Sequence, residues 1–253
     1  MKLIPFGQAP FRFVFLHGLF GRGRNWTTIA RRLAPQSSLL IDLPNHGDSE
    51  WTTSFSYPEM ARELADTLTG LDTPICLVGH SMGGRLAMLV ALTYPDLVER
   101  LVVEDTVPAT MATGGLLSLA QAMAALPLTQ IRTRHEAKEM LRGSINDETI
   151  LGFLLQNLQP GPQGSWRWVL NLEVLVREMA EVGRWPEVST CYQGPVLWIT
   201  GEKSDHAQDQ WAMRALFPLA RQLRVKSAGH WVHAEAPGLF TEAVRRFAAS
   251  AKT

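Results

Sequence analysis

A serine stands at the centre of the motif GHSMG at residues 79–83. The motif follows the apolar run ICLV at residues 75–78 and precedes a helical pattern, which is the strand–turn–helix setting of a nucleophile elbow. Glycines on both sides let the two backbones pass closely while the serine adopts a strained conformation. Its hydroxyl would project at a helix N-terminus, where a developing oxyanion is stabilised. We therefore expect Ser81 to be a nucleophile.

A second motif, HGLFG at residues 17–21, directly follows the apolar run at residues 11–16. A turn in this position can offer one backbone N–H to an acyl oxygen. We expect the N–H groups of Leu19 and Met82 to form an oxyanion hole. His17 is expected to order the turn by hydrogen bonding and not to touch the substrate.

A serine nucleophile needs a general base, and His230 is the best candidate among seven histidines. It lies on a loop after the last strand-like run, from which it can lean over the serine, and the chain order serine, acid, histidine fits such a site. His233, three residues later, competes with it but is better explained as a helix-start or core residue. We expect Phe20, His80 and Trp231 to line the substrate pocket.

Two carboxylates could orient this base. Asp105 ends the run LVVED, and Asp205 follows the run VLWI at residues 196–199. Both strand ends face the same edge of a sheet, so either side chain could reach the imidazole Nδ1–H. Glu104 is expected to point to the other side of its strand, because successive side chains alternate.

The elements that must position these residues alternate between strands and helices. The predicted strands are residues 11–16, 38–41, 75–78, 101–103, 196–199 and 223–225. The predicted helices between them are residues 26–33, 57–69, 81–93, 209–217 and 239–249. Continuous apolar strands alternating with helices indicate an α/β fold, a mostly parallel sheet with helices on both faces.

The alternation fails between residues 106 and 185, where no convincing strand is found. We expect helices there at residues 114–125, 135–141, 147–158 and 168–182. The predicted organisation is a core formed by residues 1–105 and 186–253, with residues 106–185 inserted as a helical lid (cap) over Ser81.

Composition excludes several classes of function. Lys plus Arg number 24 and Asp plus Glu number 24, so the formal net charge is zero. We therefore expect no nucleic-acid partner, since such proteins carry a clustered basic excess, and no polybasic membrane anchor. Two cysteines are too few for a disulfide scaffold, and the N-terminus lacks a secretory apolar segment, so we expect a cytoplasmic protein. Metal-ligand spacing and a dinucleotide-binding glycine motif are also missing, so no metal or cofactor is expected.

Several longer stretches resemble the α/β-hydrolase fold family, and more closely its small esterases of the YbfF type and the abhydrolase-domain protein 11 group. The matching stretches are HGLFG at 17–21, DLPNHGDS at 42–49, SYPEMARELADTL at 56–68, GHSMGG at 79–84, YPDLVERLVVEDTVP at 94–108, WRWVLNL at 166–172 and AGHWVHAEAP at 228–237. The match is looser between residues 109 and 160. The N-terminal region is too short for the usual leading strands, and Arg85 stands where lysine is common.

The resemblance also bears on the acid. The family often places it at the end of a G-x-x-D motif after the later strand, a position that Ser204 occupies here. In the YbfF group the acid instead follows the strand after the nucleophile, in a D-x-x-P context that Asp105 and Pro108 match. The resemblance thus implies Asp105, with Asp205 as the alternative.

The implied activity is hydrolysis of small or medium carboxylic esters through an acyl-enzyme on Ser81, Asp105 and His230, with a small-molecule acyl ester as the partner. An acyltransferase or a thioesterase would use the same intermediate, and nothing in the sequence separates them. A ligand receptor on this fold is disfavoured, because a pure binder has no need of a general base. Nothing in the sequence sets the oligomeric state.

Overall fold

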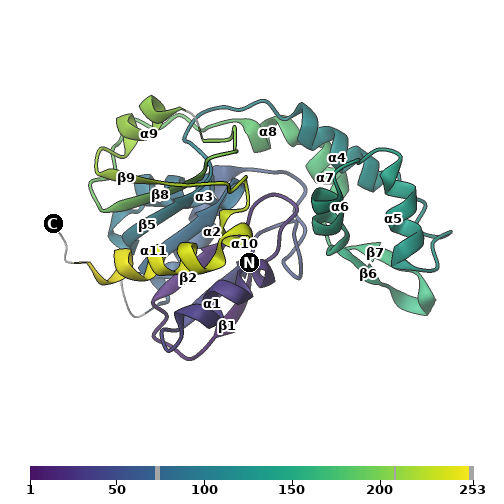
Figure 1. Ribbon diagram of the computed structural model, residues 1–253, viewed down its shortest axis with the longest axis horizontal. Helices are drawn as coiled ribbons and strands as arrows, with labels where there is room; N and C mark the ends of the chain where they lie inside the picture. Colours follow the sequence, from purple (N-terminus) through teal and green to yellow (C-terminus); the bar gives the residue numbers. More distant parts are fainter. Residues whose placement is uncertain (72–74, 208, 251–253) are drawn as a thin grey trace.

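The computed structural model describes residues 1–71, 75–207 and 209–250. A twisted sheet forms the centre of a body, and a second group of elements extends to one side of it as a lobe (Figure 1). The sheet order is β1-β3-β2-β4-β5-β8-β9, in which only β1 runs antiparallel to its neighbour. In that order the strands are β1 (Lys2–Phe6), β3 (Ser38–Asp42), β2 (Phe13–Leu16), β4 (Ile75–His80), β5 (Val98–Glu104), β8 (Val196–Gly201) and β9 (Ala220–Val225).

Helices cover both faces of the sheet. The helices of the body are α1 (Thr27–Leu33), α2 (Tyr57–Thr69), α3 (Met82–Thr93), α9 (Gln210–Leu216), α10 (Val232–Glu235) and α11 (Pro237–Ala249). Strand β2 shows how the faces divide: Val14 and Leu16 join the core beneath α2 and α3, whereas Phe13 and Phe15 join the core beneath α1 and α11. Alternate strand residues point to opposite faces, so a strand packed on both sides must be apolar throughout. The predicted α/β architecture is confirmed.

The lobe, defined here as residues 114–183, connects to the body through segments that follow β5 and precede β8. Its elements are α4 (Gly114–Ala124), α5 (Arg134–Arg142), α6 (Glu148–Leu155), β6 (Leu158–Pro160), β7 (Trp166–Trp168), α7 (Leu172–Arg177) and α8 (Met179–Gly183). The expectation that this region contains no strand was wrong, because β6 and β7 form a two-stranded antiparallel ladder. Each strand is only three residues long, too short for a visible alternation. Trp168 Nε1 donates to the Met123 carbonyl oxygen (3.0 Å) and fixes the ladder against α4.

Two boundaries also differ from the sequence prediction. The expected helix at 168–182 begins as strand β7 and then divides into α7 and α8. The N-terminal region, judged too short for a leading strand, forms β1 at the edge of the sheet, pairing with β3 from Lys2 opposite Asp42 to Phe6 opposite Ser38. Pro5 is compatible with an edge strand, where one side of the backbone has no neighbouring strand to bond.

Two buried histidines hold the loops that follow β2 and β3. His17 Nε2 accepts a hydrogen bond from the Leu43 N–H (2.9 Å), and its Nδ1 faces the Gly18 carbonyl oxygen (2.8 Å). His46 Nε2 accepts from the Phe20 N–H (3.3 Å). Burial lowers the pKa of His17 to about 4 and that of His46 to about 3. Both imidazoles are therefore neutral hydrogen-bonding groups near pH 7, and His17 orders its turn as predicted.

Gly83 makes one of the closest backbone contacts of the fold. A Cβ atom on this residue would lie 2.5 Å from the His17 carbonyl oxygen and 2.6 Å from the Leu16 carbonyl oxygen. We expect Gly83→Ala to lower the free energy of unfolding by about 1–3 kcal/mol, since α3 would have to move away from β2. Gly115→Ala is the matched control: it has open space and lies in a helix, so stability should rise by up to about 1 kcal/mol. Urea denaturation measures both, and equal effects would contradict the proposed contact.

The lowered histidine pKa values predict a pH dependence of stability. Below about pH 6.5 His46 is protonated in the unfolded chain, whereas in the folded protein it stays neutral down to about pH 3. The contribution of His46 to the free energy of unfolding is therefore complete above pH 6.5 and is lost as the pH falls from 6.5 to about 3. We expect His46→Gln to remove on the order of 2 kcal/mol of the stability difference between pH 6.5 and pH 5. His135→Gln, at an exposed position on α5, should leave the wild-type slope intact. Denaturation at several pH values tests this, and an unchanged slope in His46→Gln would refute the assignment.

Candidate active site

Ser81 occupies a strained turn between β4 and α3. Its backbone angles are φ 50° and ψ −117°, a region that side chains rarely adopt. The chain passes through this turn so tightly that a Cβ atom on Gly79 would lie 2.2 Å from the Gly83 carbonyl oxygen. The Ser81 N–H donates to the Glu104 carbonyl oxygen (3.0 Å), which ties the turn to the end of β5. The strand–turn–helix setting expected from the sequence is present.

Asp105 and His230 meet at the same edge of the sheet. His230 Nδ1 lies 2.6 Å from Asp105 Oδ2, and the Asp105 side chain is completely buried. The other carboxylate oxygen accepts from the Gly201 N–H (3.0 Å). Ser204 Oγ donates to Asp105 Oδ2, the same atom that faces the imidazole. These hydrogen bonds to both oxygens replace the hydration that the carboxylate loses on burial.

The alternative acid lies elsewhere in this loop. Asp205 is close enough to His206 for its charge to favour the protonated form of that ring. Ser204, one residue earlier, is the residue that reaches Asp105. The structure thus brings Ser81, Asp105 and His230 to one edge and fills the usual acid position with a serine that supports Asp105.

His230 is flanked by two other imidazoles. Its ring centroid lies 4.2 Å from that of His206 and 4.6 Å from that of His80. Burial, followed by the positive form of His230, lowers the pKa of both neighbours, and that of His80 falls well below its usual range. His80 Nε2 also faces the His230 carbonyl oxygen (3.0 Å). Both neighbouring rings are therefore neutral near pH 7, and they pack on either side of His230.

The turn after β2 lies directly against the serine. A Cβ atom on Gly18 would be 3.2 Å from the Ser81 Cβ. Leu19 follows in this turn, and Met82 is the first residue of α3, so both expected oxyanion donors border the serine. The Phe20 N–H is already bonded to His46, which leaves Phe20 as a wall residue, with its ring buried.

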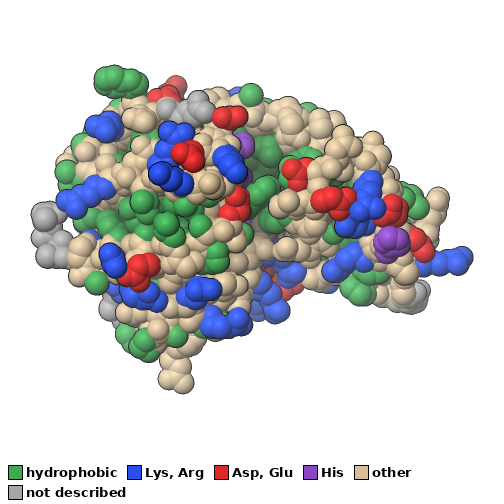
Figure 2. Space-filling view, viewed as in Figure 1, with side chains coloured by type: hydrophobic (Ala, Val, Ile, Leu, Met, Phe, Trp, Pro, Cys, Tyr) green, Lys and Arg blue, Asp and Glu red, His purple; other side chains and the backbone are tan. Residues whose placement is uncertain are grey.

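A cavity of about 230 Å³ opens above Ser81 between the body and the lobe. The space-filling view shows hydrophobic side chains in the hollow where body and lobe meet (Figure 2). Phe20, His80 and Trp231, the three expected pocket residues, all line the cavity. Its lining residues are Leu19, Phe20, Tyr57, His80, Ser81, Met82, Arg85, Met111, Leu116, Leu119, Ile150, Phe153, Leu154, Val182, His206, His230 and Trp231.

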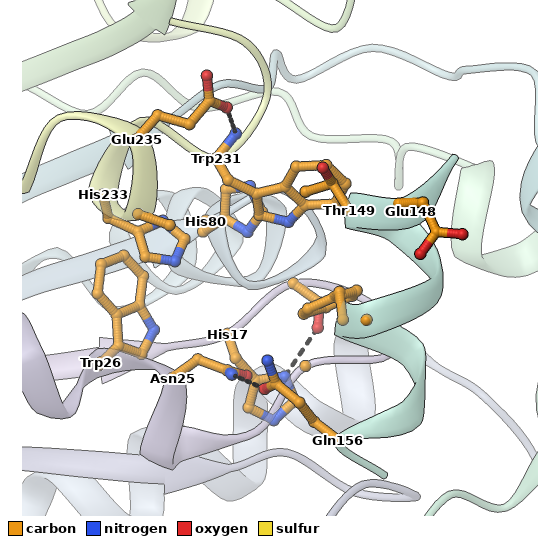
Figure 3. Close-up of a pocket in the computed structure, with 15 residues that line it drawn as sticks. His17, Asn25, Trp26, His80, Glu148, Thr149, Gln156, Trp231, His233 and Glu235 are labelled. Atoms are coloured by element: carbon orange, nitrogen blue, oxygen red, sulfur yellow. Dashed lines mark hydrogen bonds between the residues drawn. The ribbon is translucent and has the colours of Figure 1, made fainter. Parts of the chain in front are cut away.

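A second, larger groove of about 620 Å³ lies beyond His80 and Trp231. Figure 3 shows Asn25 on the body side joined to Gln156 of the lobe, a hydrogen bond of 2.9 Å. His80, Phe153 and Trp231 line both spaces, and the rings of Phe153 and Trp231 are 5.5 Å apart. These side chains therefore form the partition between the groove and the cavity that contains Ser81.

Glu104 and His233 form a separate buried pair behind the site. The Glu104 carboxylate accepts from the His233 N–H (2.7 Å) and lies 2.9 Å from its Nδ1. Glu104 thus points away from Asp105, and His233 is a core residue at the start of α10, as expected. Within the described ranges, His80, Glu104 and His233 also have possible metal-ligating atoms within 4.8 Å of one another, a grouping that the sequence analysis missed.

Sequence reasoning did not assign functions to Ser204, Gly201, Tyr57 or Arg85, although each contacts Asp105 or lines the cavity. The available signals were at Ser204, which stands at the family's usual acid position, and at Arg85, which stands where lysine is common. The other contacts join segments far apart in the chain. No helix among the described residues is long and apolar enough to cross a membrane.

Comparison with known proteins agrees with this geometry. Residues 13–243 match the model of the alpha/beta hydrolase family. The chain is 38% identical over 248 residues to the sn-1-specific diacylglycerol lipase ABHD11 of Mus musculus, covering 93% of this chain and 80% of that protein. It is 32% identical over 238 residues to esterase YbfF of Escherichia coli (strain K12), covering 92% and 91% of the two chains.

A solved structure supports the same relationship. A marine microorganism esterase aligns with a TM-score of 0.92 at 29% sequence identity, covering 97% of this chain and 98% of that one. The family match covers most of the sequence. It agrees with the sheet order, the turn at Ser81 and the contact between Asp105 and His230. The chain belongs to the α/β hydrolase family.

Proposed function

We propose that this protein is a serine hydrolase that cleaves carboxylic esters through an acyl-enzyme. The observation that carries the proposal is the convergence of three groups: Ser81 in its strained turn, and His230 bonded through Nδ1 to buried Asp105. Ser81 and His230 border the same cavity. The names of the relatives, a diacylglycerol lipase and two esterases, support ester hydrolysis as the reaction.

The proposed reaction begins when His230 takes the Ser81 proton and Oγ attacks the acyl carbonyl. The Leu19 and Met82 N–H groups stabilise the tetrahedral oxyanion, and one such donor is worth roughly 3–4 kcal/mol in other enzymes of this type. His230 then protonates the leaving alcohol. It next activates a water molecule, which releases the acid and restores the serine.

Asp105 fixes the orientation of His230 in this proposal. An acceptor at Nδ1 keeps the proton on that nitrogen, so that Nε2 is free to act as the base. The negative charge also stabilises the imidazolium that forms when the serine loses its proton. Ser204 and the Gly201 N–H hold the carboxylate in this position.

We also propose that residues 106–185 form a lid over a core of residues 1–105 and 186–253. The lobe supplies Leu116, Leu119 and Phe153 to the cavity wall, opposite Ser81. Such apolar side chains suit an acyl chain. A volume of about 230 Å³ is below the common range for ligand pockets, which favours small or medium acyl groups.

The proposed location of the enzyme is the cytoplasm. Both cysteines are free, which fits a reducing compartment. Burial raises the pKa of the Cys76 thiol to about 12, so this thiol is protonated and inert at neutral pH.

We propose a small acyl ester as the substrate, without a nucleic-acid partner.

Ester hydrolysis can be tested with p-nitrophenyl esters of increasing acyl length. We expect turnover to be highest for short or medium chains, and Ser81→Ala to lose at least about 10³-fold in kcat, because no acyl-enzyme can form. A fluorophosphonate probe should label the wild type and not the variant.

Added alcohol should leave the free acid as the main product; a dominant alcohol ester would make the protein an acyltransferase. Absence of labelling at Ser81 would refute the proposal.

The acid assignment has its own test. We expect Asp105→Asn to lower kcat by about 10³–10⁴-fold, since the imidazole tautomer is no longer fixed, while Asp205→Asn stays near wild type. Because Ser204 reaches the carboxylate oxygen that faces His230, the double variant Asp105→Asn, Ser204→Asp should recover part of the lost kcat. A large loss in Asp205→Asn and none in Asp105→Asn would reassign the acid.

A further inference from the structure

A buried guanidinium lines the cavity that contains Ser81. Arg85 lies in α3, one helical turn after the serine, and its N–H donates to the Ser81 carbonyl oxygen (2.9 Å). Only 2% of its surface is exposed. Arginine is rarely buried to this degree without a paired charge, so its surroundings carry information about the substrate.

The contacts of Arg85 compensate for its charge incompletely. Nη1 donates to the Ala109 carbonyl oxygen (2.6 Å) and Nη2 to the Gly183 carbonyl oxygen (3.0 Å). The rings of Tyr57 and Trp185 each lie 5.4 Å from the guanidinium carbon. Within residues 1–71, 75–207 and 209–250, Arg85 forms no ion pair with a carboxylate, and its buried Nε has no hydrogen-bond partner.

The rest of the cavity wall offers no competing charge. Among the described residues that line it, Arg85 is the only Lys, Arg, Asp or Glu, and most of the others are apolar. A binding pocket of this kind uses a few polar groups to orient and select its ligand. A buried cation that lacks a counter-ion is stabilised when an anion enters beside it. The cavity therefore combines an apolar channel with one site for negative charge.

The cavity shared by Ser81 and Arg85 limits the length of a suitable ligand. Ser81 is the residue before α3, and Arg85, in the first turn of that helix, lines the same cavity of about 230 Å³. An acyl group attached to Ser81 needs only a short chain to bring a second carboxylate to the guanidinium.

We propose that Arg85 binds a carboxylate at the far end of the acyl chain, so that the preferred substrates are monoesters of short dicarboxylic acids. This inference rests on the proposed esterase function and specifies its substrate class. The acyl carbonyl lies at Ser81, the methylene groups contact the apolar wall, and the distal carboxylate pairs with Arg85. A neutral chain of equal shape leaves the guanidinium without an anion.

Two esters with the same chain length and the same number of non-hydrogen atoms provide the test. Methyl hydrogen glutarate carries the distal carboxylate, whereas in methyl 5-methylhexanoate two methyl groups replace the two carboxylate oxygens. The measured quantity is the ratio of kcat/KM for the charged ester to kcat/KM for the neutral ester. We expect this ratio to be about 10 or more in the wild type, as a charge-assisted hydrogen bond would produce. A wild-type ratio at or below 1 overturns the proposal, and this comparison requires no variant.

Variants then assign the preference to Arg85. Arg85→Met should lower the ratio by about 10- to 100-fold, and Arg85→Lys should give an intermediate value, because a cation is retained without the planar fork. Arg246→Met is the matched control on α11, where the arginine is exposed and paired with Glu242, and its ratio should equal that of the wild type. A ratio unchanged by Arg85→Met would show that the arginine only holds the lobe, and would also overturn the proposal.

Failure of the inference can be distinguished from failure of the esterase function. If the neutral ester is hydrolysed through Ser81 and the charged ester is not preferred, only the Arg85 subsite is refuted. If neither ester is hydrolysed and the fluorophosphonate probe does not label Ser81, the esterase function itself is refuted, and the subsite with it. Because the ratio compares two substrates on the same preparation, a variant with a reduced fraction of active protein is still informative.

Discussion

The contact between the Ser81 turn and the loop after β2 is the constraint on which the site depends. Gly83 allows α3 to approach the carbonyl groups of Leu16 and His17 at distances that exclude any side chain. The turn that leads into α3 holds Ser81 at a positive φ angle. It also places the first N–H of α3 next to the turn at Leu19. This close approach therefore brings the Ser81 turn and both proposed oxyanion donors together.

The other residues of the site follow neighbouring parallel strands, whose carboxyl ends lie at the same edge of the sheet. Asp105 illustrates the result, because its partners come from the last residue of β8 and from the loops after β8 and β9. A completely buried carboxylate is stable only when such donors replace its hydration. The hydrogen bonds that stabilise the charge are the same ones that orient the imidazole. Stability and the proposed catalytic geometry therefore depend on the same three contacts in this region.

The turn at Ser81 and the α/β fold could be predicted from the local sequence. The glycine spacing around Ser81 and the continuous apolar strands identify the turn and the α/β fold, since both are short-range patterns. The edge strand at Lys2–Phe6 was missed, because Pro5 interrupts its pattern and its pairing partner lies more than 30 residues away. The β6–β7 ladder was missed, because three residues are too few to show alternation.

Side-chain contacts between distant segments could not be predicted from local patterns. The Ser204–Asp105 hydrogen bond joins residues 99 positions apart, and Arg85 reaches carbonyl groups at 109 and 183 at once. No spacing rule relates such positions, because they depend on how loops of the finished fold lie against one another. The sequence supported two possible acids for this reason, and the family resemblance was needed to prefer one.

The location of Asp105 at the end of β5 has a consequence for the ancestry of this enzyme. Ser81 and Asp105 both precede the lobe in the chain and are joined by α3, a short 3₁₀ helix at Pro95–Leu97 and β5. The lobe enters between Asp105 and His230, so an insertion or deletion within it leaves the serine–acid spacing untouched. Lobes of different size and lining can then be exchanged during evolution while the proposed reaction centre is inherited unchanged.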